Sequence, residues 1–147
     1  KYGHVIRTLA GASEHISTSL AAIPGLFAAM FTARQGFYFG LIYGAAVCRK
    51  ANVPLDVLVG QIPLTLKTAG LYADNFSQKA PEGNYDDTQA SLETYLGALN
   101  GILATYEETG TTDDFPRLMR DLTQRGFDAG GAKKDLTILI ETLSKGS

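Results

Sequence analysis

Apolar residues fill one long segment of the chain, residues 20–48, in which only Arg34 carries a charge. Within this segment Gly36, Gly40 and Gly44 lie four residues apart. Residues at this spacing lie above one another on one face of an α-helix, so the three glycines form a row without side chains. Because each internal glycine costs roughly 1 kcal/mol relative to alanine, the row indicates a long central helix packed closely against a partner helix, within the chain or across a dimer.

The same segment admits a second interpretation as a membrane helix. About 20 apolar residues span a bilayer, and glycines four residues apart are a familiar contact motif between membrane helices. Arg34 and Gln35 lie in the middle of the segment, however. A charge at that depth costs at least about 2.5 kcal/mol, and the mean hydropathy of the whole chain is +0.00. The pattern therefore favours a buried helix of a soluble protein, with no membrane contact.

Elsewhere the apolar positions recur at helical spacing, and no segment of five or more residues alternates convincingly as a strand does. The sequence predicts an all-α domain of about five to six helices, built on the long central helix. We expect an extended linker at 12–19, and helices at 2–11, 20–51, 54–80, 88–109, 112–126 and 132–145. The chain is accordingly divided into an N-terminal linker at 1–19 and a helical domain at 20–147.

Residues that start, stop or bend helices set these boundaries. Asn52 is expected to cap the second long helix, and Pro63 is expected to kink or break it. Residues 86–88 offer caps for the third helix, Gly110 is expected to close it, and Pro116 fits the first turn of the fourth. The residues expected to face inward are Leu92, Leu96, Leu99, Leu103 and Tyr106 on the third helix, Phe115, Leu118, Met119 and Leu122 on the fourth, and Leu136, Leu139, Ile140 and Leu143 on the last.

Composition narrows the possible functions. The chain has 147 residues and a formal net charge of −2, which gives no electrostatic case for nucleic acid. The single cysteine, Cys48, excludes a disulfide framework within the chain, and its apolar setting favours an inert core thiol. No signal peptide is evident, so we expect a cytoplasmic protein. Because the first residue is Lys1 and not methionine, the chain is expected to be a processed, truncated or engineered piece.

The polar residues offer little chemistry when read without analogy. His4 and His15 have no partner at the spacing of metal ligands, and we expect no metal site. The pairs at 86–87 and 113–114 resemble catalytic carboxylates, but each precedes a predicted helix, where a carboxylate is worth about 0.3–1 kcal/mol as a cap or dipole partner. No Walker loop is present, and no GxGxxG follows a strand, so no cofactor site is expected on this chain.

Aromatic residues are the remaining candidates for a site. Buried tyrosines normally find hydrogen-bond partners, so several of them around one cavity would orient a small polar ligand. Core packing is the alternative interpretation for each one. These aromatic residues are Phe27, Phe31, Phe37, Tyr38, Phe39 and Tyr43 on the long helix, and Tyr72, Phe76, Tyr95 and Tyr106 on later ones.

Four stretches of the chain carry a resemblance to a known family. They are the linker Ala-Gly-Ala-Ser-Glu-His-Ile at 10–16, the run from Gly-Leu-Ile-Tyr-Gly to Asn-Val-Pro-Leu at 40–55, Gly-Asn-Tyr-Asp-Asp at 83–87 with Ser-Leu-Glu-Thr-Tyr-Leu-Gly-Ala-Leu at 91–99, and Lys-Asp-Leu-Thr-Ile-Leu-Ile-Glu at 134–141. In order and spacing they resemble the C-terminal helical domain of the imine reductases and reductive aminases, relatives of the β-hydroxyacid and 6-phosphogluconate dehydrogenases. The resemblance covers most of the chain.

This resemblance implies a two-domain, NADPH-dependent oxidoreductase in which an N-terminal Rossmann domain holds the cofactor. It implies an intertwined homodimer in which two chains exchange helical domains, with the row Gly36, Gly40 and Gly44 at the subunit contact. The whole enzyme would transfer hydride from NADPH to a C=N or C=O carbon of a small-molecule substrate. Since this chain lacks the Rossmann half, we expect it to be inactive and to bind no NADPH by itself.

The resemblance also assigns roles, with one departure. Phe27 falls where the family often has an Asp or Tyr proton donor, and phenylalanine donates no proton. Tyr38 and Tyr43 are therefore the candidate catalytic acids, with water as the alternative. Phe27, Tyr72 and Tyr95 are the candidate substrate-binding residues. Two other functions stay open: a stand-alone, non-catalytic helical module for binding or dimerisation, and a small membrane-associated protein.

Overall fold

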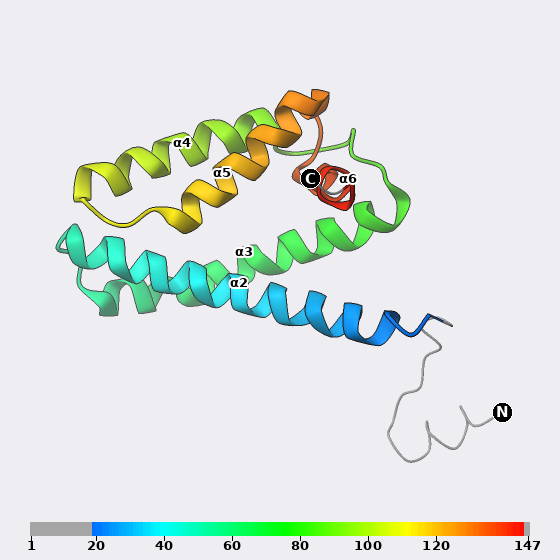
Figure 1. Ribbon diagram of the computed structural model, residues 1–147. Coiled ribbons are helices and arrows are strands. Elements are labelled where there is room, and N and C mark those ends of the chain that lie inside the picture. The colour runs from blue at the N-terminus through cyan, green and yellow to red at the C-terminus, as the bar shows by residue number, and fades with distance from the viewer. Residues whose placement is uncertain (1–18, 146–147) are drawn as a thin grey trace, which may run out of the picture. The chain divides into compact units, whose positions relative to one another are not determined.

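The structure is a computed structural model that describes residues 19–145, and these residues are helical nearly throughout (Figure 1). They form five α-helices, a π-helical turn and a 3₁₀ turn. These are α2 (Ala22–Lys50), α3 (Leu55–Glu82), α4 (Leu92–Thr109), α5 (Asp114–Gly126), η1 (Phe127–Gly131), η2 (Leu136–Ile138) and α6 (Leu139–Ser144). The described residues include no strand, only an isolated bridge between Ser91 and Asp135. The all-α prediction is confirmed, whereas the helix expected at 2–11 and nearly all of the linker lie outside the described residues.

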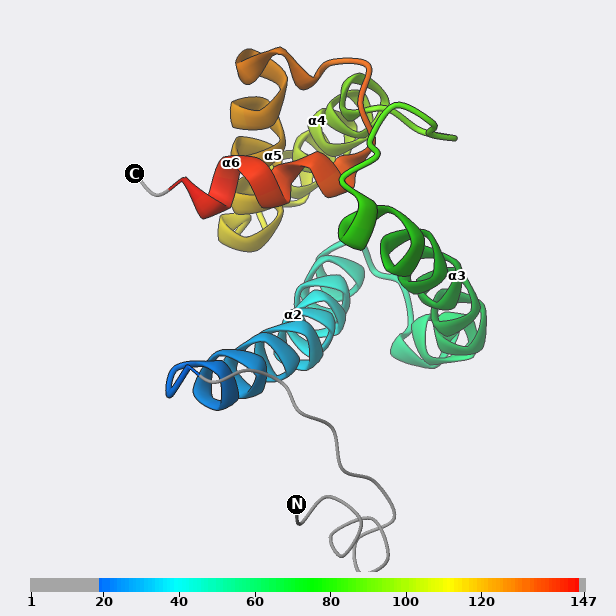
Figure 2. The same ribbon diagram turned by 90° about the vertical axis from the view of Figure 1, so that its right-hand side faces the viewer.

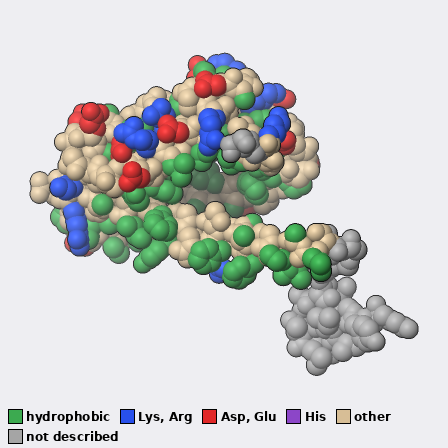
Figure 3. Space-filling model, in the orientation of Figure 1, with side chains coloured by type: hydrophobic (Ala, Val, Ile, Leu, Met, Phe, Trp, Pro, Cys, Tyr) green, Lys and Arg blue, Asp and Glu red, His purple; other side chains and the backbone are tan. Residues whose placement is uncertain are grey.

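The chain divides into two units, residues 1–39 and 40–147, and each is described by itself. The described part of the first unit is the N-terminal portion of α2, and the rest of α2 opens the second unit. No residue of α2 is buried. Hydrophobic side chains cover its surface, whereas charged side chains gather over α4 and α5 (Figure 3). Within residues 19–145, none of the helices combines the length and the apolar character that crossing a membrane requires.

The second unit has its core where α4, α5 and the C-terminal segments meet. α4 and α5 lie side by side and antiparallel (Figure 1), and α6 crosses α5 (Figure 2). The stripe predicted on α4 is confirmed, since Leu92 is 0% exposed, Tyr106 is 7% exposed and the three leucines between them are half-buried. On α5 the prediction is wrong for Leu118 and Met119, which are exposed.

Different residues of α5 are buried because the chain returns over them. Thr123 and Gly126 are buried, and Gly126 lies beside Leu92 and Leu139. The absence of a side chain at Gly126 lets α6 approach closely at this point. Glycine and threonine do not count as apolar in a helical pattern. The pattern therefore predicted a different buried face for α5.

The cap expected at Asn52 is wrong, as is the break expected at Pro63, whereas the kink expected there stays a prediction. Asn52 adopts a left-handed conformation with φ 56°, which Asn tolerates better than most residues. The Val53 N–H then donates to the Cys48 carbonyl at 2.8 Å, so Asn52 closes α2 and does not cap α3. α3 runs unbroken through Pro63. No residue of α3 is buried, so the carbonyl that Pro63 leaves without a donor lies open to water.

The start of α4 and the last predicted helix also differ from expectation, for one shared reason. Ser91, not residues 86–88, caps α4, and its side chain accepts from the Thr94 N–H. The N–H groups of Leu92 and Glu93 donate to the carbonyls of Lys134 and Ala132, at 2.9 and 3.1 Å. Residues 132–135 thus satisfy the first turn of α4 and are not helical themselves. The helix predicted at 132–145 is shortened to η2 and α6.

Candidate functional site

Tyr72 and Tyr95, both predicted to bind substrate, line the same surface hollow. Tyr72 projects from α3 and Tyr95 from the first turn of α4. With residues 88–90 and Asp135 they enclose about 460 Å³. A second hollow of about 290 Å³ shares both tyrosines and Asp135, and continues over the apolar side chains of η2 and α6. The structure therefore brings together two candidates that lie far apart in the sequence.

The two tyrosines of this hollow differ in their surroundings. Tyr72 is 59% exposed, whereas Tyr95 is half-buried. Burial raises the pKa of Tyr95 above its ordinary value of 10.0, and Tyr72 and Asp135 beside it raise the pKa further. The Tyr95 phenol is therefore neutral at physiological pH and retains its proton. The two phenols also share a hydrogen bond, so together they offer a donor to the oxygen or nitrogen of a polar ligand in the hollow.

Asp135 also lines the hollow, and only 4% of it is exposed. One carboxylate oxygen accepts from Thr88 Oγ1 at 2.8 Å and Asn75 Nδ2 at 3.2 Å. The other accepts from the N–H of Thr137 at 2.9 Å and from its hydroxyl at 2.6 Å. Burial raises the pKa of Asp135, but these hydrogen bonds outweigh burial and leave the pKa below 3.8. The side chain is therefore an ionised acceptor with several donors.

The sequence analysis missed Asp135 because it placed residues 132–145 in one helix. A local signal was present, since an Asp two residues before a Thr is typical of a side chain that caps its own turn. The Asp135 carboxylate caps η2 in this way through the Thr137 N–H. The contacts with Thr88 and Asn75 span 47 and 60 residues of sequence, and no local pattern reveals them.

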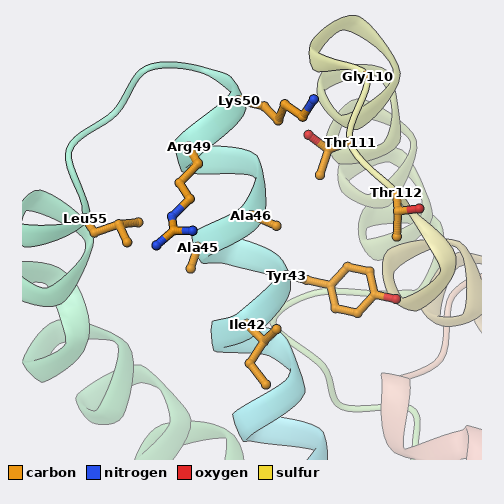
Figure 4. Close-up of a pocket in the computed structure, with 10 residues that line it drawn as sticks. All are labelled: Ile42, Tyr43, Ala45, Ala46, Arg49, Lys50, Leu55, Gly110, Thr111 and Thr112. Atoms are coloured by element: carbon orange, nitrogen blue, oxygen red, sulfur yellow. The ribbon is translucent and has the colours of Figure 1, made fainter.

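Tyr43, a predicted catalytic residue, lies in a different place. It lines a groove of about 730 Å³ between α2, the start of α3 and the loop after α4. Its ring points from α2 toward the loop that carries Thr112, and Lys50 extends toward Gly110 and Thr111 (Figure 4). The Tyr43 ring stands 5.6 Å from the Phe115 ring. Within the second unit, the structure does not join Tyr43 to the hollow of Tyr72 and Tyr95.

Tyr106, which lies next to this groove, is a buried tyrosine with a role in packing. Tyr106 is 7% exposed, and burial raises its pKa, followed by the proximity of Cys48 and Tyr43. Cys48 is a free, half-buried thiol. These contacts agree with the expected core packing of Cys48 and place no nucleophile in an open cleft.

Phe27 and Tyr38 belong to the first unit, and both are largely exposed. Phe27 is 66% exposed and stacks on Phe31, with the ring centroids 6.5 Å apart. Tyr38 is 60% exposed. Their predicted roles, substrate binding for Phe27 and proton donation for Tyr38, stay predictions.

The paired carboxylates make ion pairs. Asp113 lies at the N-cap position of α5, and its side chain pairs with Arg117 and does not cap the helix. Asp86 pairs with Lys134 of the C-terminal segment. His4 and His15 lie outside the described residues. In the part of the chain that the structure describes, no three His, Cys, Asp or Glu side chains gather as metal ligands do.

Comparison with known families identifies this all-helical arrangement. The family described as NADPH-dependent reductive aminase-like, C-terminal domain, matches residues 20–145. Because the match covers most of the 147 residues, the chain belongs to this family of C-terminal domains. The resemblance noted in the sequence is thereby confirmed. No curated protein matches the sequence significantly.

Solved structures show the same fold at low sequence identity. The chain is similar to an imine reductase from Myxococcus stipitatus in complex with NADP+, with a TM-score of 0.83 and 23% identity over 95% of this chain and 53% of that one. For a variant of that enzyme in complex with NAD+, the TM-score is 0.83 and the identity is 24%, over 97% of this chain and 51% of that one. For a reductive aminase from Aspergillus terreus in complex with NADPH4, cyclohexanone and allyl amine, the TM-score is 0.77 and the identity is 22%, over 97% of this chain and 51% of that one. The chain thus spans about half the length of these enzymes.

Proposed function

We propose that the chain is the dimerisation and substrate-binding domain of an NADPH-dependent oxidoreductase that reduces a C=N or C=O bond. The family match over residues 20–145 carries the proposal. The similar enzymes are named as imine reductases and a reductive aminase, in complexes with NADP+, NAD+ or NADPH4. We assign the nucleotide to the half of those enzymes that this chain does not match, because residues 19–145 contain no strand from which a Rossmann unit could be built.

The exposed apolar surface supports an obligate homodimer. Neither α2, with 29 residues, nor α3, with 28, has a single buried residue. A Cβ at Gly44 would meet nothing within 4 Å among the described residues, and one at Gly40 would meet only Phe115 at 3.9 Å. In the first unit, Gly36 is likewise open within its own helix. Gly36 and Gly44 therefore leave room for a helix of a second copy, whereas Gly40 lies beside Phe115 of its own chain.

Both helices also leave many large apolar side chains exposed. Obligate homodimers commonly bury about 2,000 Å² or more of largely apolar surface. Large apolar side chains left exposed in α2 and α3 are Ile23, Leu26, Phe27, Met30, Phe31, Phe37, Tyr38, Phe39, Ile42, Val57, Val59, Leu64, Leu66, Leu71, Tyr72 and Phe76. Soluble monomers rarely expose so many large apolar side chains on two helices, and a second copy would cover them.

In the proposed enzyme, the hollow of Tyr72 and Tyr95 holds the substrate. Their hydroxyls orient its oxygen or nitrogen, and the apolar side chains of η2 and α6 exclude water from its hydrocarbon part. NADPH supplies hydride to the C=N or C=O carbon. A proton must reach the nitrogen or oxygen, and we assign that step to Tyr43 or Tyr38 of one of the two copies.

A chimera tests the proposal directly. The nucleotide-binding half of the Aspergillus terreus reductive aminase is fused ahead of this chain, and NADPH consumption is followed with cyclohexanone and allyl amine. We expect turnover from the chimera and none from either half alone. A chimera that forms a dimer and binds NADPH, yet consumes none with any ketone and amine pair, would contradict the proposal and favour a stand-alone, non-catalytic module.

A further inference from the structure

Asp135 joins the two walls of the hollow that Tyr72 and Tyr95 line. Its carboxylate is buried, lines the same hollow as both tyrosines and is held by side chains from three separate segments. We propose that Asp135 is a positioning residue, which sets the separation of Tyr72 and Tyr95 and thereby the fit of the substrate between them. The inference rests on the proposed function of the hollow, but the geometry it invokes is testable without any activity.

On the α3 side, the link runs through Asn75. Tyr72 and Asn75 are three residues apart, so they share one face of the helix. Asn75 Nδ2 donates to the Asp135 carboxylate at 3.2 Å, and Lys79 Nζ, one turn further along, stands 4.0 Å from the same oxygen. Lys79 and Asp135 are both nearly buried, with side-chain exposures of 12% and 6%. The turn of α3 that carries Tyr72 is thus anchored on Asp135.

On the α4 side, the link runs through the backbone and Thr88. The Thr88 hydroxyl lies 2.8 Å from both the Asp135 carboxylate and the Ala90 carbonyl, which share its one proton, and it accepts from the Ala90 N–H at 3.2 Å, which fixes the loop just before α4. Asp135 forms the isolated bridge with Ser91, the residue that caps α4. Tyr95 follows in the first turn, and its N–H donates to the Ser91 carbonyl at 3.0 Å. Movement of Asp135 therefore moves the turn that carries Tyr95.

A carboxylate meets the demands of this site, whereas an amide does not. The Thr137 N–H at one oxygen of Asp135 can only donate, and so can the Lys79 ammonium that faces the other oxygen at 4.0 Å. An Asn side chain offers one acceptor oxygen, and its NH₂ group would face one of these donors. At least one buried donor is then left without an acceptor, and the local structure has to shift to relieve it.

The test measures position and binding separately in an Asp135→Asn variant. The seven tyrosines of the chain are replaced by 3-fluorotyrosine, and the ¹⁹F resonances of Tyr72 and Tyr95 are assigned with Tyr→Phe variants. We expect both resonances to shift while that of Tyr43, in the separate groove, stays in place. The matched control is Tyr85→Phe, which removes a 2.9 Å hydrogen bond to Glu141 between the same loop and the C-terminal segment; Tyr85 does not line the hollow, and its backbone carbonyl still accepts from the Asp135 N–H.

In the active chimera, Asp135→Asn is expected to raise KM for the ketone about tenfold and to change kcat by less than about twofold, since the binding geometry is altered and the reacting groups remain. Tyr85→Phe is expected to lower the melting temperature and leave KM unchanged. Unshifted Tyr72 and Tyr95 resonances, or an unchanged KM, would overturn the inference. If Asp135→Asn does not fold, Thr88→Val removes a single donor and must give the same two effects, smaller in size. An inactive chimera with shifted resonances contradicts only the proposed function.

Discussion

Leu92 packs directly against the backbone of Gly131. A Cβ at Gly131 would lie 2.9 Å from Leu92 Cδ1 and 2.7 Å from the carbonyl oxygen of Gly126. Leu92 is 0% exposed and is the largest fully buried side chain among the described residues. The missing side chain at Gly131 is what lets the π-helical turn η1 close over the start of α4.

We expect Gly131→Ala to destabilise the domain by about 1–3 kcal/mol, because one of the two crowded neighbours is backbone and has no room to move. Gly97→Ala on α4 is the control. It introduces the same methyl group where nothing lies within 4 Å, and is expected to be neutral or to stabilise the helix by up to about 1 kcal/mol. Urea unfolding of both variants, followed by circular dichroism, decides the point. Equal midpoints for the two variants would show that the closure over Leu92 is not tight.

The glycine row predicts a dimer that one large side chain disrupts. The chain has a mass of 15.7 kDa, and light scattering at micromolar concentration is expected to give about twice that value. Gly44→Leu should yield the monomer, because the row no longer admits a second helix.

Gly97→Leu is the matched control for that variant. Gly97 is an equally open glycine, but it lies on α4, outside the row, and its substitution is expected to leave the dimer intact. A wild-type monomer, or a Gly44→Leu variant that remains dimeric, would refute the role of the row.

The fold was predictable where the sequence of a single helix determines its position and its end. The apolar stripe of α4 and the left-handed Gly110, with φ 62°, stood at the expected positions, because period and capping are local properties. The start of α4 and the last helix were predicted wrongly. Both depend on hydrogen bonds from the first N–H groups of α4 to the carbonyls of residues 132 and 134, which lie about 40 residues further along the sequence. Tertiary hydrogen bonds of this kind override local helix propensity.

The candidate site shows the same division. Tyr72 and Tyr95 were singled out as aromatic residues and through the family resemblance, and the structure places both in one hollow. Asp135, which lines the same hollow, was not found, because its partners Asn75 and Thr88 are remote in sequence. Residue type indicates what chemistry a side chain can perform, whereas long-range packing decides which side chains share a cavity.

Three tyrosine hydroxyls can be ranked by removing them one at a time in the chimera. Tyr95→Phe is expected to lower kcat/KM about five- to tenfold, because a lost hydrogen bond to bound substrate is worth about 1–1.5 kcal/mol. Tyr43→Phe and Tyr38→Phe lower kcat, not KM, if either is the proton donor. Steady-state kinetics with NADPH, ketone and amine measure all three. If kcat/KM is unchanged in every variant, the hydroxyls have no role and water is the proton source.

The low pKa of Asp135 predicts a loss of stability in acid. Burial alone raises this pKa, but the donors Thr137, Thr88 and Asn75 outweigh it and hold the pKa below its ordinary value of 3.8. The native state therefore binds the proton less readily than the unfolded chain does. The resulting stabilisation is complete above about pH 4 and is lost as the pH falls through the lowered pKa.

Urea midpoints measured between neutral pH and strongly acidic pH should fall in the acidic range. Asp135→Asn should remove part of that fall while lowering stability at neutral pH by about 1–3 kcal/mol. Asp86→Asn, which removes an exposed carboxylate paired with Lys134, is the control and should leave the acid profile unchanged. An identical acid profile for wild type and Asp135→Asn would mean that the Asp135 carboxylate titrates alike in the folded and unfolded chains.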